Sequence, residues 1–249
     1  MSDFTKFLWQ LNGWMYGIFA IGVIIFLITA WVRYGGKAGT RYAAERMLRK
    51  DGGISNKTRG MAGEELTYRY LKENVFDKDV IFRNVLVRRS DGKKLTQIDM
   101  LAVGQKGVYV IENKSMTGRI YIYGKSQTMT EYFEGGKKSK PFRNPIEQNR
   151  FHVEQLKNRL DIAGVDVSDM PFYSVIVLGD ACQIMKKVDV PNDTVIANRQ
   201  DIKNELAKVV GGSSKAVDER KRAFLCESIR KTQANMGTKK EHARQYKKT

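Results

Sequence analysis

Hydrophobic and polar residues follow two periods along this chain, and each period predicts one kind of element. Short runs rich in β-branched and aromatic residues indicate strands. They occur at residues 80–88, 96–103, 108–114, 119–123, 128–133, 172–178 and 194–197. Apolar residues at helical spacing indicate helices at about 60–74, 144–160, 199–210 and 216–234. The run at 172–178 is apolar almost without interruption, which is typical of a strand buried inside a sheet.

The central pattern is a β-hairpin that extends from Thr96 to Lys114. Two apolar runs flank Gly104-Gln105-Lys106-Gly107, which is a turn sequence. A tight turn of about two or four residues would pair Val103 with Val108. This pairing fixes the register of the rest of the hairpin.

The same register brings two acidic residues together at the far end of the hairpin. It places Asp99 opposite Glu112, and Gln97 opposite Lys114. Because side chains alternate along a strand, Asp99, Glu112 and Lys114 share one face with apolar neighbours. Opposed carboxylates on such a face repel, and a divalent cation between them would turn the repulsion into a binding site. The alternative is an ordinary surface cluster in which Lys114 neutralises both acids.

Two helices offer further candidates. Glu64 falls in line with Tyr68 and Leu71, on a face that turns inward. An inward carboxylate needs a partner or a task, although Glu64 would also be favoured by the helix dipole if it lay near the helix N-terminus. The second candidate is Gln148, on the helix predicted at 144–160.

Asn144 and Pro145 predict the start of a helix, as N-cap and first-turn proline. Gln148 lies in the first turns, off the stripe that would pack on the sheet. It is either a site residue or a surface glutamine. We interpret His152, one turn along, as a flanking residue and not as a ligand.

The N-terminal segment predicts a membrane anchor. About twenty uncharged residues at 13–32 are enough to cross a bilayer as a helix, with tryptophans at both ends and basic residues concentrated after the segment. The alternative is a buried core helix. We expect a single-pass anchor at 1–34 with its N-terminus outside and the remaining chain cytoplasmic. Residues 35–59 would be a basic juxtamembrane segment and linker that binds anionic lipids.

Charge and composition indicate the kind of partner and argue against some kinds of metal and catalytic site. The net charge of +17 and the pI near 9.8 indicate an anionic partner, either nucleic acid or lipid headgroups. Cys182 and Cys226 lack metal-ligand spacing, which argues against a zinc module. His152 and His242 are the only histidines, so a metal bound by oxygen ligands is favoured over a histidine base. The basic segment 135–140 predicts a mobile loop that is either solvated or in contact with phosphates.

Taken together, these motifs resemble those of the NERD (nuclease-related) domain. The resemblance extends from about residue 60 to 160 and continues into the strand at 172–178. The segments that carry it are Gly63-Glu64-Glu65, Gln97-Ile98-Asp99, Gly107 to Lys114, Gly118, and Asn144 to Asn149. NERD domains are considered relatives of the PD-(D/E)XK nucleases. The resemblance therefore implies an α/β fold, with a central mixed sheet flanked by helices.

The resemblance also implies roles for individual residues. Asp99 resembles the metal-binding aspartate, and Glu112 with Lys114 resembles the (D/E)-x-K pair. Glu64 resembles the acid of the first helix, and Gln148 the glutamine of the later helix. The expected domains are a nuclease-like domain at 60–210, a C-terminal helix at 211–236 and a basic disordered tail at 237–249.

Two hypotheses of function follow from these observations. The first is a membrane-anchored nuclease that hydrolyses phosphodiester bonds in DNA, or as a second choice RNA, with magnesium or manganese held by Asp99, Glu112 and Glu64. Because no base-reading motif is visible, contacts would be mainly to the phosphate backbone. The second is a non-catalytic nucleic-acid-binding or scaffold protein at the cytoplasmic membrane face. Protein partners are not indicated by the sequence.

Overall fold

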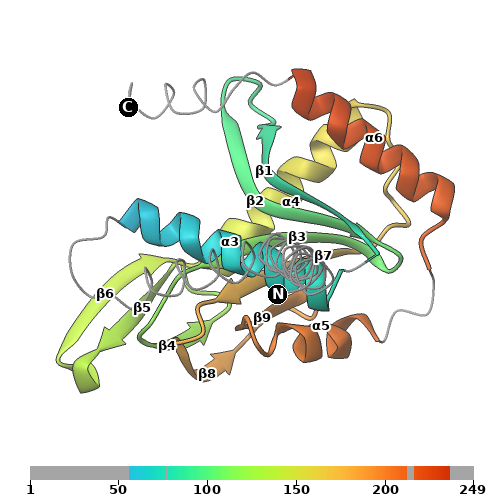
Figure 1. Cartoon of the computed structure of the whole chain (residues 1–249). Coiled ribbons are helices and arrows are strands. Elements are labelled where there is room, and N and C mark those ends of the chain that lie inside the picture. Colours follow the sequence, from blue (N-terminus) through green and yellow to red (C-terminus); the bar gives the residue numbers. More distant parts are fainter. Residues whose placement is uncertain (1–55, 77, 212–215, 236–249) are drawn as a thin grey trace, which may run out of the picture. The chain divides into compact units, whose positions relative to one another are not determined.

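A computed structural model of the chain describes residues 56–76, 78–211 and 216–235 (Figure 1). The predicted membrane anchor, most of the juxtamembrane segment and the basic tail lie outside these residues. Within the described ranges, no helix has the length and apolar character needed to cross a bilayer.

The helices and strands agree with the sequence pattern except at β6, β8 and the starts of α3, α5 and α6. The helices are α3 (Asn56–Asn74), α4 (Pro145–Ile162), α5 (Ile202–Val210) and α6 (Glu219–Asn235), with a short 3-10 turn η2 (Glu134–Gly136). The strands are β1 (Val80–Arg88), β2 (Leu95–Gly104), β3 (Gly107–Lys114), β4 (Arg119–Tyr123), β5 (Thr128–Phe133), β6 (Lys138–Arg143), β7 (Phe172–Leu178), β8 (Gln183–Val188) and β9 (Thr194–Asn198).

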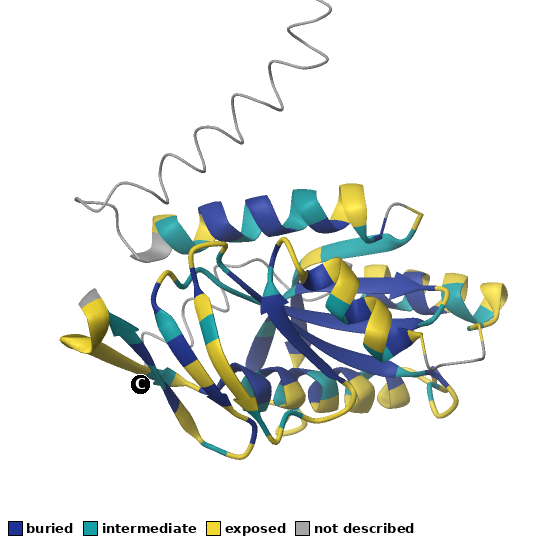
Figure 2. Cartoon of the chain, turned by 90° about the horizontal axis from the view of Figure 1, so that it is seen from below, coloured by how far each residue is buried: buried dark blue, intermediate teal, exposed yellow. Residues whose placement is uncertain are grey.

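The central sheet has the order β1-β2-β3-β7-β9 and is mixed. Strands β1, β2 and β3 are antiparallel, whereas β3, β7 and β9 run parallel. Buried strands lie between helices on both faces (Figure 2). One face packs on α3 and α5 through residues such as Leu71 and Ile202, and the other packs on α4 and α6 through residues such as Leu156 and Leu225. The predicted α/β arrangement of a mixed sheet flanked by helices is confirmed.

A second sheet of order β6-β5-β4-β8 lies beside the first. Its strand β6 corrects one prediction, because the mobile loop expected at 135–140 is partly a strand. All six residues of β6 pair with β5, although most of their side chains are exposed. Backbone hydrogen bonds rather than burial therefore hold this strand, and its lysines and Pro141 suit a sheet edge. Strand β8 was also missed, since it too carries mostly exposed side chains.

The predicted hairpin turn is confirmed. Val103 pairs with Val108, and Gly104 pairs with Gly107. Gly107 has a φ of 143°, and a Cβ there would lie 2.4 Å from the carbonyl oxygen of Pro171. Only glycine combines this backbone conformation with so close an approach.

The start of α4 is also confirmed in detail. Asn144 is fully buried, and its Oδ1 accepts a hydrogen bond from the backbone N–H of Ile146 at 2.9 Å. Its Nδ2 donates to the carbonyl oxygens of Tyr123 and Ser126, in the turn between β4 and β5. The cap therefore holds α4 and the second sheet together.

Three helix starts were predicted incorrectly. Helix α3 begins at Asn56 rather than near Gly60. The prediction missed its first turn because that turn is polar and shows no apolar periodicity. Helix α5 begins at Ile202, three residues later than expected, and Asp201 takes the N-cap position. Helix α6 begins at Glu219, also three residues later than expected.

Candidate active site

The candidate site lies where β2 and β3 separate. The ladder between these strands ends at Met100 and Ile111, one pair before the predicted pairing of Asp99 with Glu112. Asp99 instead turns its carboxylate toward β3, where Oδ2 accepts the backbone N–H of Asn113 at 3.0 Å. Beyond Met100, therefore, a carboxylate takes the place of a backbone hydrogen bond.

Glu112, Lys114 and Gln148 form a closed ring of hydrogen bonds. Lys114 Nζ donates to Glu112 Oε1 at 2.7 Å and to Gln148 Oε1 at 3.0 Å. Gln148 Nε2 donates to the same Glu112 oxygen at 2.7 Å. The side chain of Glu112 is 4% exposed and that of Lys114 is 23% exposed. The ammonium group therefore lies between a buried carboxylate and the solvent.

Burial and mutual repulsion disfavour the charged carboxylates. Burial, the negative charge of Asp99 and that of Glu64 raise the pKa of Glu112 to about 7, although Lys114 opposes this shift. Burial also raises the pKa of Asp99, against the effects of the Asn113 N–H and of Lys114. Without a further cation, the site holds fewer negative charges than its composition suggests.

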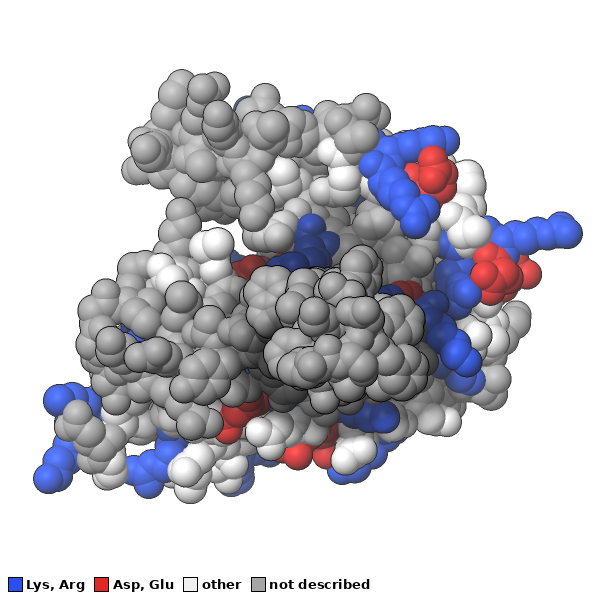
Figure 3. Space-filling view, viewed as in Figure 1, with Lys and Arg blue, Asp and Glu red and all other residues white. Residues whose placement is uncertain are grey.

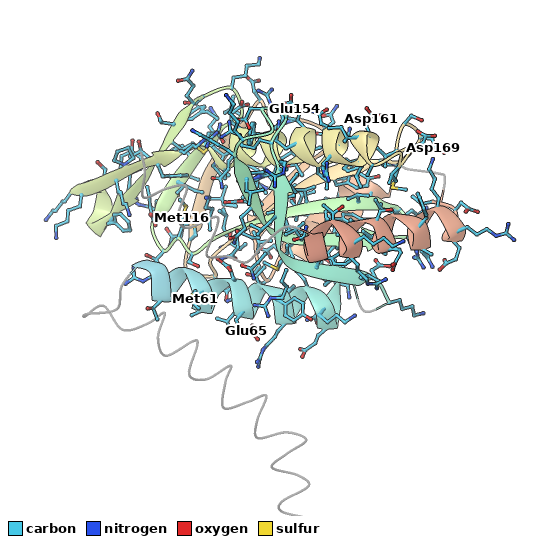
Figure 4. The ribbon with its side chains drawn as sticks, turned by 90° about the horizontal axis from the view of Figure 1, so that it is seen from above. Met61, Glu65, Met116, Glu154, Asp161 and Asp169 are labelled. Carbon is cyan, nitrogen blue, oxygen red and sulfur yellow. The ribbon has the colours of Figure 1, made fainter. Side chains whose placement is uncertain are left out.

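Glu64 approaches the site from α3. The helix begins at Asn56, so Glu64 lies more than two turns from the N-terminus and the helix-dipole interpretation does not apply. A Cβ at Gly63 would lie 1.8 Å from Ser115 Oγ, which shows how closely the helix approaches the loop after Lys114. Figure 4 shows the same approach, with Met116 of that loop beside the part of α3 that carries Met61.

The neighbouring Glu65 has a different role. It pairs with Arg69 at 2.7 Å and with Arg83 of β1 at 2.9 Å. Glu65 is therefore paired with arginines from two elements.

Asn113 and Glu131 were not predicted as site residues, but they fix the backbone around Lys114. Asn113 Oδ1 accepts a hydrogen bond from Thr67 Oγ1 of α3 at 2.6 Å. Glu131 Oε1 accepts the backbone N–H groups of Thr117 and Gly118. Asn113 could have been predicted as a site residue, because it lies between Glu112 and Lys114. Nothing in the sequence pattern indicates such a role for Glu131.

Asn149 and His152 of α4 complete the surroundings. Asn149 is fully buried and donates to the carbonyl oxygen of Val110 and to Ser174 Oγ. The sequence could have indicated this role, because Asn149 is the one polar residue in a stripe of apolar residues at helical spacing: Ile146, Val153, Leu156 and Leu160. These bonds fix α4 against β3 and β7, and hence fix Gln148 over Glu112.

His152 lies closer to the site than a flanking residue would. Its Nδ1 lies 3.1 Å from Thr96 Oγ1, and its Nε2 lies 3.7 Å from Glu112 Oε2. Burial, with the charges of Lys114 and Arg143, lowers the pKa of His152 to about 4. The imidazole is therefore neutral near pH 7 and makes no ion pair with Glu112.

The donor set suits a hard divalent cation, although the side chains are not gathered around one point. Among the described residues, no group of three or more His, Cys, Asp or Glu is arranged as metal ligands. Asp99, Glu112 and Glu64 nevertheless supply only carboxylate oxygens, which magnesium and manganese prefer. Burial is the main cause of the raised pKa values of Asp99 and Glu112, and a bound cation would favour their charged forms.

Residues 59–179 match the family model of the nuclease-related domain, NERD. This segment includes all five predicted site residues, so the chain is similar to the nuclease-related domain over the part that carries the candidate site.

One similar protein is an uncharacterized protein of Bacillus anthracis, which is 30% identical over 135 residues. The alignment covers 54% of this chain and 58% of the relative, so the chain spans less than two thirds of that protein. No solved structure matches the chain.

Proposed function

We propose that this protein hydrolyses phosphodiester bonds in DNA, with RNA as a second choice of substrate. The observation that carries the proposal is the closed ring of Lys114, Glu112 and Gln148 beside Asp99. An ammonium group held between a carboxylate and an amide is positioned for a reaction in which negative charge develops on a phosphate. The nuclease-related domain of residues 59–179 supports the same reaction class.

Each residue would have a distinct role. A magnesium or manganese ion held by Asp99 and Glu112, with Glu64 completing or extending the shell, would neutralise phosphate charge and activate water. Lys114 uses two of its three ammonium donors within the ring, and the third would orient the attacking water or stabilise the transition state. Gln148 would keep Lys114 and Glu112 in register.

The surface also supports a nucleic-acid substrate. Lys and Arg side chains project from the tip of the β5–β6 hairpin, at the lower left of Figure 3. Lys137, Lys138 and Lys140 of this segment are all exposed. Such residues would bind the phosphate backbone without reading bases.

One observation favours a second candidate function, that of a non-catalytic binding or scaffold protein. Glu112 Oε1 already accepts two hydrogen bonds, from Lys114 and Gln148. This bonding would compete with a metal ion for that oxygen. A protein of this kind would hold nucleic acid without cutting it.

We also propose that residues 1–34 anchor the protein in the cell membrane, with the N-terminus outside and the domain cytoplasmic. The uncharged run at 13–32 and the basic flank that follows it support this orientation. The basic flank would bind anionic lipid headgroups.

The test is a cleavage assay of the full chain, purified in mild detergent. Plasmid and linear DNA would be incubated with magnesium or with EDTA. We expect magnesium-dependent cleavage that is lost in Asp99→Asn and in Lys114→Ala. Asp161→Asn on α4 (labelled in Figure 4) and Lys203→Ala on α5 make the same changes at exposed positions, and should remain active.

Two outcomes would separate the candidates. Cleavage that survives both site substitutions would sink the assignment of the active site. Salt-sensitive binding of DNA without cleavage in any condition would support the scaffold.

A further inference from the structure

A polar pocket adjoins the hydrogen-bonded ring on the α4 side. It has a volume of about 260 Å³, and its polar lining comes from β2, α4 and the segments that carry Arg89 and Arg143. Gln148 belongs both to the pocket wall and to the ring. The pocket and the site therefore share a side chain.

Two guanidinium groups line this pocket without any acidic residue in the wall. Arg89 lies over the ring of Phe151, with its Cζ 5.0 Å from the ring centroid. Among the residues that the structure describes, its carboxylate partner is Asp91, at a long distance of 3.8 Å. Asp91 already accepts the backbone N–H groups of Lys93 and Lys94, so it neutralises Arg89 only weakly.

Arg143 supplies the second positive charge from the opposite element. It is the last residue of β6 and directly precedes Asn144, whose buried side chain fixes the backbone at this point. In the described part of the chain, no carboxylate lies within ion-pairing distance of Arg143. Its charge reaches into the pocket, since it helps to lower the pKa of His152.

We infer that this pocket binds a phosphate group of the nucleic-acid strand, next to the phosphate that is cleaved. The inference rests on the proposed function and adds a subsite to it. Planar guanidinium groups bind phosphate through paired hydrogen bonds, and Thr96 and Gln97 add polar groups to the same wall. The volume is below the roughly 300 Å³ of a small-molecule site, so it suits a phosphate with part of its sugar rather than a whole nucleotide.

The subsite also answers an electrostatic problem of the proposed reaction. Asp99, Glu112 and Glu64 repel a phosphate that approaches the site. A neighbouring phosphate bound between Arg89 and Arg143 would hold the strand against this repulsion. The strand would then be positioned by one phosphate and cut at the next.

The test measures binding apart from cleavage. The full chain in mild detergent would be titrated, in EDTA, into a fluorescent single-stranded oligonucleotide at several salt concentrations. We expect Arg89→Gln and Arg143→Gln each to weaken binding about tenfold, and to reduce the salt slope by about 0.7 for each lost phosphate contact. Arg220→Gln on α6 removes the same charge from an exposed position outside the pocket, and should change the affinity less than twofold.

Two further measurements show which phosphate of the strand is bound and test whether a variant has misfolded. Oligonucleotides with a 5′-phosphate or a 5′-hydroxyl would show whether a terminal or an internal phosphate is bound. Arg89→Lys keeps the charge and loses the planar fork, so it should bind with intermediate affinity. If both glutamine variants bind like Arg220→Gln, the subsite is overturned even if the protein cuts DNA. If binding falls as expected but no condition gives cleavage, the nuclease proposal fails and the phosphate pocket stands.

Discussion

Lys114 and Glu112 lie two residues apart on β3, and the lysine ammonium donates to the buried glutamate carboxylate at 2.7 Å. Side chains two residues apart share a face of a strand, so the backbone alone brings this pair together. Gln148 comes from α4, 34 residues beyond Lys114, and bonds to both. The ring therefore depends on how α4 packs on the sheet.

Gln148→Leu should reduce cleavage by about 10–100-fold, because residues that orient a catalytic group typically contribute this much. Leucine fills a similar volume but makes neither hydrogen bond. Lys114 would then be held by Glu112 alone. The readout is the initial rate of DNA cleavage, and thermal unfolding of the same samples checks folding. Asn158→Leu, at an exposed position on the same helix, is the control, and an equal loss in both variants would contradict the role of the ring.

Stability should respond to pH through Glu112. A carboxyl whose pKa is raised on folding contributes stability at low pH and loses it as the pH rises from its unfolded toward its folded pKa. For Glu112 this window extends from 4.5 to about 7. In the absence of divalent cations the loss amounts to about 3 kcal/mol. The unfolding free energy of Glu112→Gln should not show this pH-dependent loss.

The buried, neutral His152 acts in the opposite direction. Its pKa falls from 6.5 to about 4 on folding, so its contribution to stability grows as the pH rises through that window. The measurement is therefore the difference in unfolding free energy between wild type and Glu112→Gln, in guanidinium chloride at pH 5 and pH 8. A difference that does not change between these pH values would show that Glu112 titrates normally.

Magnesium should stabilise the protein if Asp99 and Glu112 bind it. At about 100 times its dissociation constant, a ligand adds about 2.7 kcal/mol, which corresponds to a rise of roughly 5–10 °C in the unfolding midpoint. Differential scanning fluorimetry with magnesium or EDTA would measure the shift. Asp99→Asn should abolish it and Asp161→Asn should preserve it. An equal shift in Asp99→Asn would place the metal elsewhere.

Two glycines of α3 should respond oppositely to alanine. At Gly60 an added Cβ meets no atom within 4 Å, so Gly60→Ala should stabilise by about 0.5–1 kcal/mol. At Gly63 the Cβ would meet Ser115 Oγ at 1.8 Å and Asn113 Nδ2 at 3.2 Å, so Gly63→Ala should destabilise by about 1–3 kcal/mol. Urea unfolding measures both.

A second substitution tests the cause of that loss. Ser115→Ala removes the nearest atom, so the pair Gly63→Ala with Ser115→Ala should show a favourable coupling of at least about 0.5 kcal/mol. Strict additivity of the two changes would mean that α3 does not press on this loop.

The sequence predicted the elements whose side chains are buried in a regular pattern. The hairpin register follows from Val103 and Val108, and the start of α4 follows from Asn144 and Pro145. Strands β6 and β8 escaped prediction because backbone pairing, not apolar side chains, holds them. Their lysines give the same pattern as a solvated loop.

The candidate site was predicted less completely than the fold. Glu112 and Lys114 are related by strand alternation, so their contact was readable from spacing. The end of the β2–β3 ladder at Met100 was not, because it depends on the carboxylate of Asp99 replacing a backbone bond. The nearness of His152 to Glu112 was not predicted, since it arises only when α4 is placed on the sheet. The domain boundaries, the membrane anchor and the metal remain predictions.

The buried amide of Asn144 has a mechanical consequence. It is bonded at once to the β4–β5 turn and to the first turn of α4, and Gln148 lies one helical turn further on. A displacement of the β4–β5 turn would therefore shift the first turn of α4, and with it Gln148, which bonds to Lys114.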